Sequence, residues 1–261
     1  MSPQAPPIAL TIAGSDSGGG AGIQADLKTF HARGVHGLSV IAAITSQNTR
    51  GVTAVHSVPL KHIHSQIAAV FDDFPIAAVK TGMLGSAAIT RLVAKEMRAR
   101  KPAWLVVDPV MIATSGARLL DTDAVQAMVD ELIPLADVLT PNLPEAEALL
   151  GRKLRTAQDY DQAGEALLAL GARSVLLKGG HADGHEVVDR YYDDRGVMEL
   201  RHPRMPIEGH GTGCTLASAV ATELAKGHAP RSAVRRAVAY VHRALSRSYR
   251  PGGGAAHVLK H

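Results

Sequence analysis

Short runs of apolar residues recur along the chain, and each ends in glycines or polar residues. The runs lie at Ile8–Ala13, Leu38–Ile44, Ala77–Lys80, Trp104–Val107, Ala136–Leu139 and Ser174–Leu177. Such runs are typical of strands buried on both faces of a sheet. Apolar residues at helical spacing follow several of them, notably over 60–71 and 87–100. The pattern predicts an α/β fold with a mostly parallel sheet covered by helices.

Two other patterns add to this fold. Residues 52–58 resemble an edge strand, and residues 187–201 alternate polar and apolar side chains around a turn at 193–196, which indicates a β-hairpin. No linker or shift in composition divides the chain. We therefore expect a disordered tail over residues 1–7, a single domain over 8–250 and a C-terminal tail over 251–261.

Composition narrows the class of protein. Of the 261 residues, 46% are hydrophobic and 20% are charged, which is typical of a globular protein. The net charge of +4 suits an anionic ligand, but an aromatic content of 3% leaves few stacking platforms, so we expect no nucleic-acid partner. No apolar run is long enough to span a bilayer, so no membrane association is expected. A single cysteine excludes an intramolecular disulfide and suits the cytoplasm.

The stretch from His210 to Ala219 carries the strongest chemical signal. Gly211 and Gly213 flank Thr212 at a tight turn that leads into an apolar segment, as at the start of a helix. A helix start attracts phosphate through free N–H groups and a partial positive charge, which would also stabilise a Cys214 thiolate. The alternative is a glycine-rich helix entry with a small buried cysteine.

A second glycine-rich loop follows the first predicted strand. Residues 14–26 contain the glycines together with the acidic pair Asp16 and Asp26. A dinucleotide fingerprint is excluded because Ile23 stands where its third glycine belongs, and no P-loop motif occurs in the chain. The loop either brings its backbone close to a ligand or is a flexible connection between strand and helix.

Polar residues follow four other predicted strands. Ligands bind at the carboxyl edge of open α/β sheets, so Gln47 could read a small polar ring, although local turn chemistry explains its segment equally well. Asp108 could hold Mg²⁺ through water or cap the next turn. Asn142 and Glu145 resemble a helix capping pair, yet their oxygens could also reach a hydrated cation. Lys178, beside two glycines, suits a phosphate.

The ordered set of motifs resembles the ribokinase-like superfamily and, within it, the hydroxymethylpyrimidine and phosphomethylpyrimidine kinases of thiamine biosynthesis. The resemblance extends from Ala9 to about Tyr249. Its motifs are Thr11–Asp16, Gly18–Thr29, Gln47–Thr49, Lys80–Leu84, Asp108–Met111, Thr140–Glu145, Lys178–His181 and His210–Leu216. It implies a three-layer sandwich with helices on both faces of the sheet.

The resemblance also implies a reaction and a substrate site. ATP with Mg²⁺ would phosphorylate 4-amino-5-hydroxymethyl-2-methylpyrimidine and then extend the monophosphate to the diphosphate. The residues implied to line the pyrimidine pocket are Gly14, Asp26, Gln47, Met83 and Val110. The Gly252–His257 segment matches the family's closing motif only approximately.

The remaining implied roles concern catalysis. Gly211, Thr212 and Gly213 would form the anion hole, and Cys214 holds the position of the base that is Asp in most of the superfamily. Asp108 and Glu145 would organise Mg²⁺ through water. Residues implied to contact the ATP phosphates are Lys178, Asn142 and Thr212.

Two rival functions fit the same motifs. A pyridoxal or pyridoxine kinase of the same fold also phosphorylates a hydroxymethyl group on an aromatic ring, and Cys214 and Gln47 favour the pyrimidine. A non-catalytic pyrimidine-binding regulator would keep the fold without turnover, which the retained Lys178, Glu145 and 211–214 set opposes. The resemblance further suggests a homodimer.

Overall fold

A computed structural model describes residues 5–111, 122–182 and 184–261. Eight strands of this described part form the central sheet in the order β10-β9-β8-β7-β6-β5-β1-β2. Their bounds are β1 (Ile8–Ala13), β2 (His36–Ile41), β5 (Ala78–Thr81), β6 (Leu105–Val107), β7 (Val138–Leu139), β8 (Val175–Leu177), β9 (Glu186–Asp193) and β10 (Gly196–Pro203). The pairs from β2 to β8 are parallel, and β9 and β10 join antiparallel. The predicted mostly parallel sheet and the 187–201 hairpin are confirmed.

Successive strand residues supply two separate hydrophobic cores, as the two-residue repeat of a strand requires. In β1, Leu10 and Ile12 belong to one core, whereas Ala9 belongs to the other. In β8, Leu176 points away from the core that holds Val175. A sheet buried on both faces explains why the strands read as continuous apolar runs.

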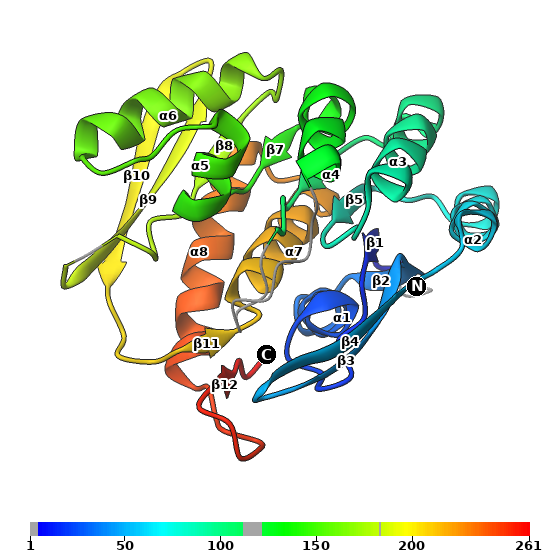
Figure 1. The fold of residues 1–261 in the computed structure, drawn as a ribbon, viewed down its shortest axis with the longest axis horizontal. Helices are drawn as coiled ribbons and strands as arrows, with labels where there is room; N and C mark the ends of the chain where they lie inside the picture. Colours follow the sequence, from blue (N-terminus) through cyan, green and yellow to red (C-terminus); the bar gives the residue numbers. More distant parts are fainter. Residues whose placement is uncertain (1–4, 112–121, 183) are drawn as a thin grey trace.

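Helices cover both faces of this sheet, so the implied three-layer sandwich is confirmed (Figure 1). One layer contains α2 (Leu60–Asp73), α3 (Ala87–Arg100), α4 (Thr122–Ala127), a π turn (Met128–Leu132), a 3₁₀ turn (Ile133–Leu135), α5 (Leu143–Leu150) and α6 (Ala157–Ala169). The other contains α1 (Gly22–Ala32), α7 (Thr212–Ala225) and α8 (Pro230–Ser246). Helices α1 and α7 both begin at the carboxyl edge of the sheet, where ligands bind in α/β folds.

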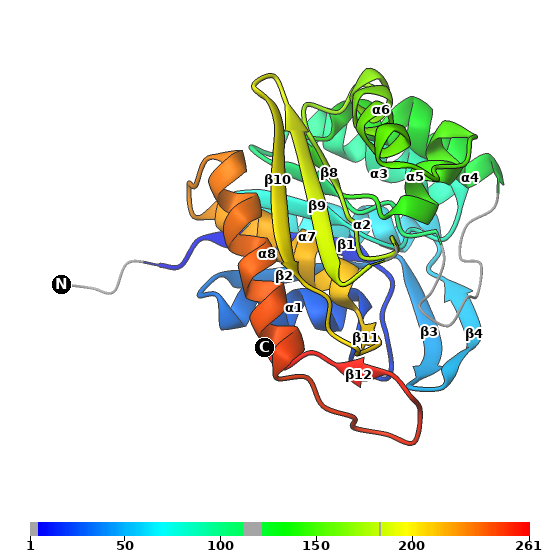
Figure 2. The same cartoon turned by 90° about the vertical axis from the view of Figure 1, so that its left-hand side faces the viewer.

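The predicted strand over 38–44 is divided in the structure. β2 ends at Ile41, and the chain leaves the central sheet to form β3 (Ala43–Asn48), which pairs antiparallel with β4 (Gly51–Ser57). The predicted edge strand at 52–58 is therefore in this separate hairpin, which stands at the side of the molecule (Figure 2). Ala42 anchors the change of direction, since its N–H donates to Ala13 O and its carbonyl accepts from Val58.

The C-terminal segment returns to the sheet edge. The short strands β11 (Gly209–His210) and β12 (His257–Val258) pair in parallel, directly before α7. Within residues 251–261, for which the sequence predicts only a tail, β12 thus lies beside β11, next to the glycine-rich turn (Figure 2). Residues 1–4 of the predicted N-terminal tail lie outside the described residues.

Over the described ranges, none of the helices has the combination of length and hydropathy that a bilayer crossing requires.

Candidate active site

The N-terminus of α7 is shaped by the predicted glycine turn. Gly211 has a left-handed backbone with φ of 78°, and a Cβ there would collide with the carbonyl oxygen of Gly20. The first backbone bond of the helix runs from Thr215 N–H to Gly211 O. The N–H groups of Gly213 and Cys214 precede that bond and have no acceptor within the helix. This turn therefore presents donors and a positive dipole end to an anion.

Lys178 faces this turn from the end of β8. Its Nζ lies 3.0 Å from Asp108 Oδ1 and 3.5 Å from Glu145 Oε2. A Cβ at Gly213 would lie 3.2 Å from the same Nζ. The structure thus brings together the predicted phosphate and metal residues Lys178, Asp108 and Glu145 beside the predicted anion hole.

Electrostatics in this cluster are strong because its members are buried. Burial opposes the charge of Lys178, but Asp108 and Glu145 outweigh it and hold the pKa of the ammonium above its usual range. Burial raises the pKa of Glu145 to about 7, an effect that Lys178 opposes and Asp108 reinforces. A multiply charged anion would therefore meet a cation that stays charged at neutral pH.

Asn142 and Glu145 form the helix cap that their spacing predicts. Glu145 N–H donates to Asn142 Oδ1 at 2.8 Å, and Asn142 N–H donates to Glu145 Oε2 at 2.7 Å. The capping interpretation is confirmed. It does not compete with the cluster, since Glu145 Oε2 also faces Lys178.

The donor set around Asp108 fits a magnesium ion held through water. Asp108 Oδ1 accepts from Lys178 and Thr140, while Oδ2 is buried and has no hydrogen-bond partner among the described residues. Mg²⁺ prefers oxygen ligands, keeps several waters and binds proteins through one or two carboxylates together with substrate phosphates. No group of three or more His, Cys, Asp or Glu side chains in the described ranges could cage a metal alone.

A cavity of about 200 Å³ opens beside the same turn. Its lining includes Lys178, Thr212 and Gly213. Most of its inner wall is apolar, with Met205, Ile207, Leu216, Val238, Val241 and Leu245 as members. A cavity that combines these apolar side chains with the charge of Lys178 suits a ligand that joins phosphates to a flat base. No local pattern predicts this wall, because its residues come from separate segments of the chain.

The predicted pyrimidine-pocket residues divide into two groups. Gly14 donates its N–H to Met83 O at 2.9 Å, and a Cβ at Gly14 would collide with the Met83 side chain. Val110 follows Asp108, to whose carbonyl its N–H donates at 2.8 Å. Asp26 instead lies under the site, where its carboxylate is fully buried against Lys80. Its predicted contact with the pyrimidine stays a prediction.

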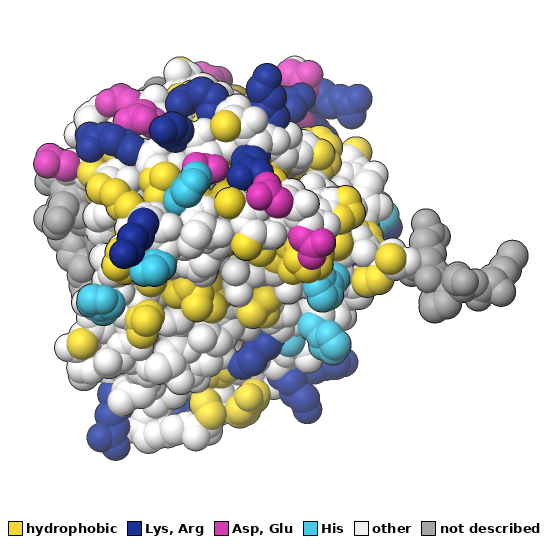
Figure 3. Space-filling model, turned by 90° about the vertical axis from the view of Figure 1, so that its right-hand side faces the viewer, with side chains coloured by type: hydrophobic (Ala, Val, Ile, Leu, Met, Phe, Trp, Pro, Cys, Tyr) yellow, Lys and Arg dark blue, Asp and Glu magenta, His cyan; other side chains and the backbone are white. Residues whose placement is uncertain are grey.

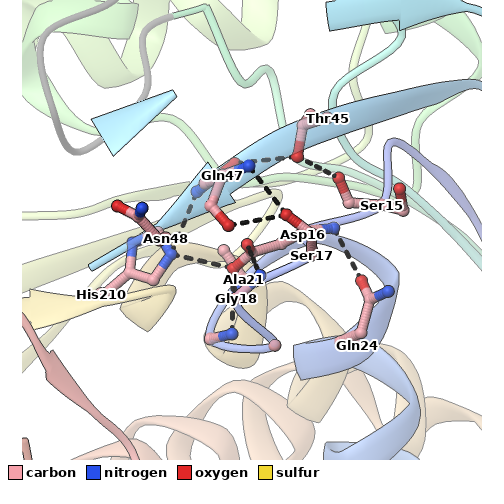
Figure 4. Close-up of polar contacts among 12 residues, drawn as sticks. Ser15, Asp16, Ser17, Gly18, Ala21, Gln24, Thr45, Gln47, Asn48 and His210 are labelled. Atoms are coloured by element: carbon pink, nitrogen blue, oxygen red, sulfur yellow. Dashed lines mark hydrogen bonds and ion pairs between the residues drawn. The ribbon is translucent and has the colours of Figure 1, made fainter. Parts of the chain in front are cut away.

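Gln47 approaches from the β3–β4 hairpin and meets two residues that the sequence did not assign (Figure 4). Its Nε2 lies 3.1 Å from His210 Nε2, which lies 3.0 Å from Asp16 Oδ2. The Asp16 carboxylate also accepts backbone N–H groups of Gly18, Gly20 and Ala21. Burial opposes this charge, but the hydrogen bonds to His210 and the backbone lower the pKa of Asp16. The sequence marks Asp16 only as one half of an acidic pair. No local pattern predicts that His210 contacts it.

The Cys214 thiol is less acidic than its place at a helix start predicts. The helix start predicts a stabilised thiolate, but burial raises the pKa of the thiol to about 11, with Asp26 and Asp108 reinforcing and Lys80 opposing the shift. The side chain is nevertheless partly exposed. Burial and the acidic neighbours therefore act against the stabilised thiolate that the helix start predicts.

Comparison with known proteins identifies this arrangement. Residues 16–259 match the family model described as phosphomethylpyrimidine kinase. The chain belongs to the phosphomethylpyrimidine kinase family. Over 241 residues it is 51% identical to the hydroxymethylpyrimidine/phosphomethylpyrimidine kinase of Rhizobium meliloti, covering 92% of this chain and 90% of that protein.

Solved structures agree with this family. A phosphomethylpyrimidine kinase from Clostridium difficile 630 is 46% identical, with a TM-score of 0.82 and coverage of 91% of this chain and 99% of that chain. The pyridoxal kinase from Staphylococcus aureus, in complex with AMP-PCP and pyridoxal, is 34% identical, with a TM-score of 0.91 and coverage of 99% and 94%. The phosphomethylpyrimidine kinases thus share their fold with kinases for another hydroxymethyl-bearing ring.

Proposed function

We propose that this chain uses ATP to phosphorylate 4-amino-5-hydroxymethyl-2-methylpyrimidine and then its monophosphate, giving the diphosphate used in thiamine biosynthesis. The observation that carries the proposal is that Lys178, paired with Asp108 and Glu145, faces the turn at the N-terminus of α7 that carries Cys214. Phosphoryl transfer depends mainly on positioning and charge stabilisation, and this edge of the sheet supplies both.

The first phosphorylation requires one proton acceptor. The substrate hydroxyl oxygen forms a bond to the γ-phosphorus, the bond from that phosphorus to the β,γ-bridging oxygen breaks, and its electron pair leaves with ADP. We assign the departing hydroxyl proton to Cys214 in its thiolate form, which becomes a thiol. Because the raised pKa makes the thiolate the minor form at neutral pH, Cys214 first releases its own proton to solvent. The N–H groups of Gly213 and Cys214, together with Lys178, stabilise the negative charge on the transferred group.

Mg²⁺ would be held through water by Asp108 and Glu145 and would neutralise charge on the ATP phosphates. Thr212 and Asn142 lie at the same edge, and we assign them to the phosphates together with Lys178. The base of ATP would enter the 200 Å³ cavity, whose apolar wall suits a flat ring.

The pyrimidine would lie between the β1 loop, the residues after β5 and the hairpin. Gly14, Met83 and Val110 supply the apolar sides, and Gln47 supplies a polar group for the ring. Asp16 and His210 hold Gln47 in place. We place the enzyme in the cytoplasm, where a lone thiol stays reduced.

We further infer a homodimer formed through the β3–β4 hairpin. Ile44 and Val55 are 53% and 48% exposed there, and β4 pairs only with β3 among the described strands. Hydrophobic side chains lie across the middle of this side of the molecule, with most Lys and Arg toward its upper and lower ends (Figure 3). An open strand edge with apolar side chains is a template for pairing with a second copy. Val55→Lys should convert the dimer to a monomer in light scattering, whereas Thr53→Lys on the same strand leaves a smaller effect.

A coupled assay for ADP release tests the reaction. The hydroxymethylpyrimidine, its monophosphate and pyridoxal are offered separately with ATP and Mg²⁺. Turnover of both pyrimidines well above pyridoxal supports the proposal. Preference for pyridoxal would move the assignment to the rival kinase, and tight pyrimidine binding without any turnover would favour a regulator.

A further inference from the structure

One buried ion pair beside the site has no part in the chemistry described above. Lys80 Nζ lies 2.9 Å from Asp26 Oδ2 and 3.1 Å from Oδ1, and both side chains are 0% exposed. The carboxylate also accepts hydrogen bonds from Thr11 Oγ1 and Ser218 Oγ. Taking two charges out of water costs several kcal/mol each, about as much as the pairing returns. A gain in folding stability alone therefore does not explain why the chain contains this buried ion pair.

Its location points to another reason. Ser218 stands one turn beyond Cys214 in α7, and Asp26 stands one turn beyond Gly22 in α1. Residues four apart lie on the same side of a helix. Helices α1 and α7 are in contact at both of these turns. The backbone of Gly22 is hydrogen-bonded to Cys214, and Ser218 donates a hydrogen bond to Asp26. The ion pair therefore lies one helical turn beneath the thiol.

We propose that Lys80 is a positioning residue whose ammonium, oriented by Asp26, compensates the charge of Cys214 when its thiol loses the proton. The proposal rests on the proposed function for the value of that proton transfer to catalysis. It concerns the thiol itself, however, and can be tested without turnover.

Charged side chains on, or directly after, four elements of the fold act electrostatically on the Cys214 thiol. Lys80 on β5 and Lys178 after β8 favour the thiolate, whereas Asp26 on α1 and Asp108 after β6 favour the thiol. Lys80 acts on the thiol more strongly than Asp26 does. Removing the two charges one at a time should therefore change the thiol pKa in opposite directions, and removing both should leave a small upward shift.

The test measures iodoacetamide alkylation of the full chain across a pH series. Cys214 is the only cysteine, so every modified protein reports this site. Lys80→Met should raise the thiol pKa by about one unit and slow alkylation about tenfold at a fixed pH below it, and Asp26→Asn should speed it by a similar factor. A purely structural role predicts the same direction for both, because a loosened site exposes the thiol.

Two further variants make the result decisive. The neutral pair Asp26→Asn/Lys80→Met leaves no buried charge unpaired and should still alkylate about threefold more slowly than the parent chain. Glu223→Gln is the matched control, because Glu223 also joins α7 to the C-terminal end of α1 through Arg33, five residues beyond Ser218. It should leave the alkylation profile unchanged. An unshifted profile in the neutral pair, or shifts of one sign in both single variants, would overturn the proposal.

A pH profile of the first phosphorylation separates this proposal from the proposed function. In Lys80→Met, the limb that reports Cys214 should move by the same amount as the alkylation pKa. If alkylation shifts and the activity profile does not, the compensation by Lys80 is supported and the assignment of Cys214 as proton acceptor fails.

Discussion

The Nε2 atom of His210 lies 3.0 Å from Oδ2 of Asp16, although the two residues are 194 positions apart in the sequence. His210 ends β11, immediately before the anion-binding turn, and Asp16 lies in the loop after β1. The contact therefore joins the proposed phosphate side of the site to the proposed pyrimidine side, through the residues drawn in Figure 4. Because the loop backbone also donates to Asp16, His210 is held against a fixed carboxylate.

Breaking this contact should weaken pyrimidine use more than ATP use. His210→Ala removes a hydrogen bond to a charged group, worth about 1.5–3 kcal/mol, and releases Gln47. We expect kcat/KM for the hydroxymethylpyrimidine to fall about 10- to 100-fold, with a smaller change in the KM for ATP. Steady-state kinetics with each substrate varied in turn measure both values.

His228→Ala is the control for this prediction. His228 also faces a carboxylate, with Nε2 3.3 Å from Glu223 Oε2, but at the far end of α7. Its kinetics should match those of the parent chain. A larger rise in the KM for ATP than for the pyrimidine in His210→Ala would contradict the proposed link to Gln47.

The two phosphorylations should differ in their need for Cys214. The hydroxymethyl group must lose a proton, whereas the monophosphate is already an anion and needs no strong base. Cys214→Ala should lower the first reaction about 100-fold or more, a typical contribution of general-base catalysis, and lower the second less. Single-turnover rates with each acceptor provide the comparison. Equal losses would mean that Cys214 acts by shaping the turn.

Glu145 makes the folded protein less stable as pH rises, when Mg²⁺ is absent. Burial raises its pKa in the folded state to about 7 from an ordinary value of 4.5, so the folded protein binds the proton more tightly than the unfolded chain. Stability therefore falls as pH rises between those two values and stays lower above them. Glu145→Gln keeps the side-chain shape needed for the cap and removes the buried charge.

In metal-free buffer at pH above the Glu145 titration, Glu145→Gln should raise the free energy of unfolding by about 1–3 kcal/mol. The gain should vanish in acid, where Glu145 itself is neutral. Urea titrations at several pH values measure the difference. A constant difference between variant and parent across that range would contradict a titrating Glu145. Activity should fall in the same variant, because a neutral amide holds Mg²⁺ less well.

The sequence pattern predicts a structural feature correctly where that feature depends on residues that are close together in the chain. Strand runs, the α3 bounds at 87 and 100, and the Asn142–Glu145 cap all depend on neighbouring residues. The gathering of polar residues at one edge was also predictable, because carboxyl ends of parallel strands meet on one side of a sheet. Motif resemblance then added the reaction and its substrate.

Other features depend on contacts that no local pattern encodes. A run of apolar residues shows the same pattern whether it forms one strand or is shared between two sheets. The prediction of a single strand over 38–44 therefore misses the break between β2 and β3. Asp16 and Asp26 look equivalent in a glycine-rich loop, yet one faces His210 and the other is buried against Lys80. The raised pKa of Cys214 likewise arises from burial and from acids on two other elements.

The C-terminal loop should matter for the pyrimidine side of the site. Gly254 N–H donates to Thr49 Oγ1 at 3.0 Å, two residues beyond Gln47, and a Cβ at Gly254 would collide with the Thr49 carbonyl. Gly254→Ala must displace backbone, at a cost of about 1–3 kcal/mol. We expect a lower melting temperature and a higher KM for the hydroxymethylpyrimidine.

Gly253→Ala is a control from the same loop. A Cβ there would lie 2.9 Å from the Arg50 guanidinium, the end of a flexible side chain that can move aside. This variant should keep the parent melting temperature and KM. Equal behaviour of the two variants would show that the loop does not position Gln47.

The apolar cavity beside Lys178 provides a test of nucleotide placement. Val241 on α8 lines this 200 Å³ space, so Val241→Phe should fill part of it without touching the carboxylate cluster. The KM for ATP should rise about tenfold or more, which corresponds to a loss of about 1.4 kcal/mol, while the KM for the pyrimidine stays nearly constant. Arg243→Phe adds the same ring at an exposed position of α8 and should change neither value. If Val241→Phe leaves the KM for ATP unchanged, the base binds elsewhere, and only the phosphate end of the nucleotide is placed by Lys178 and the α7 turn.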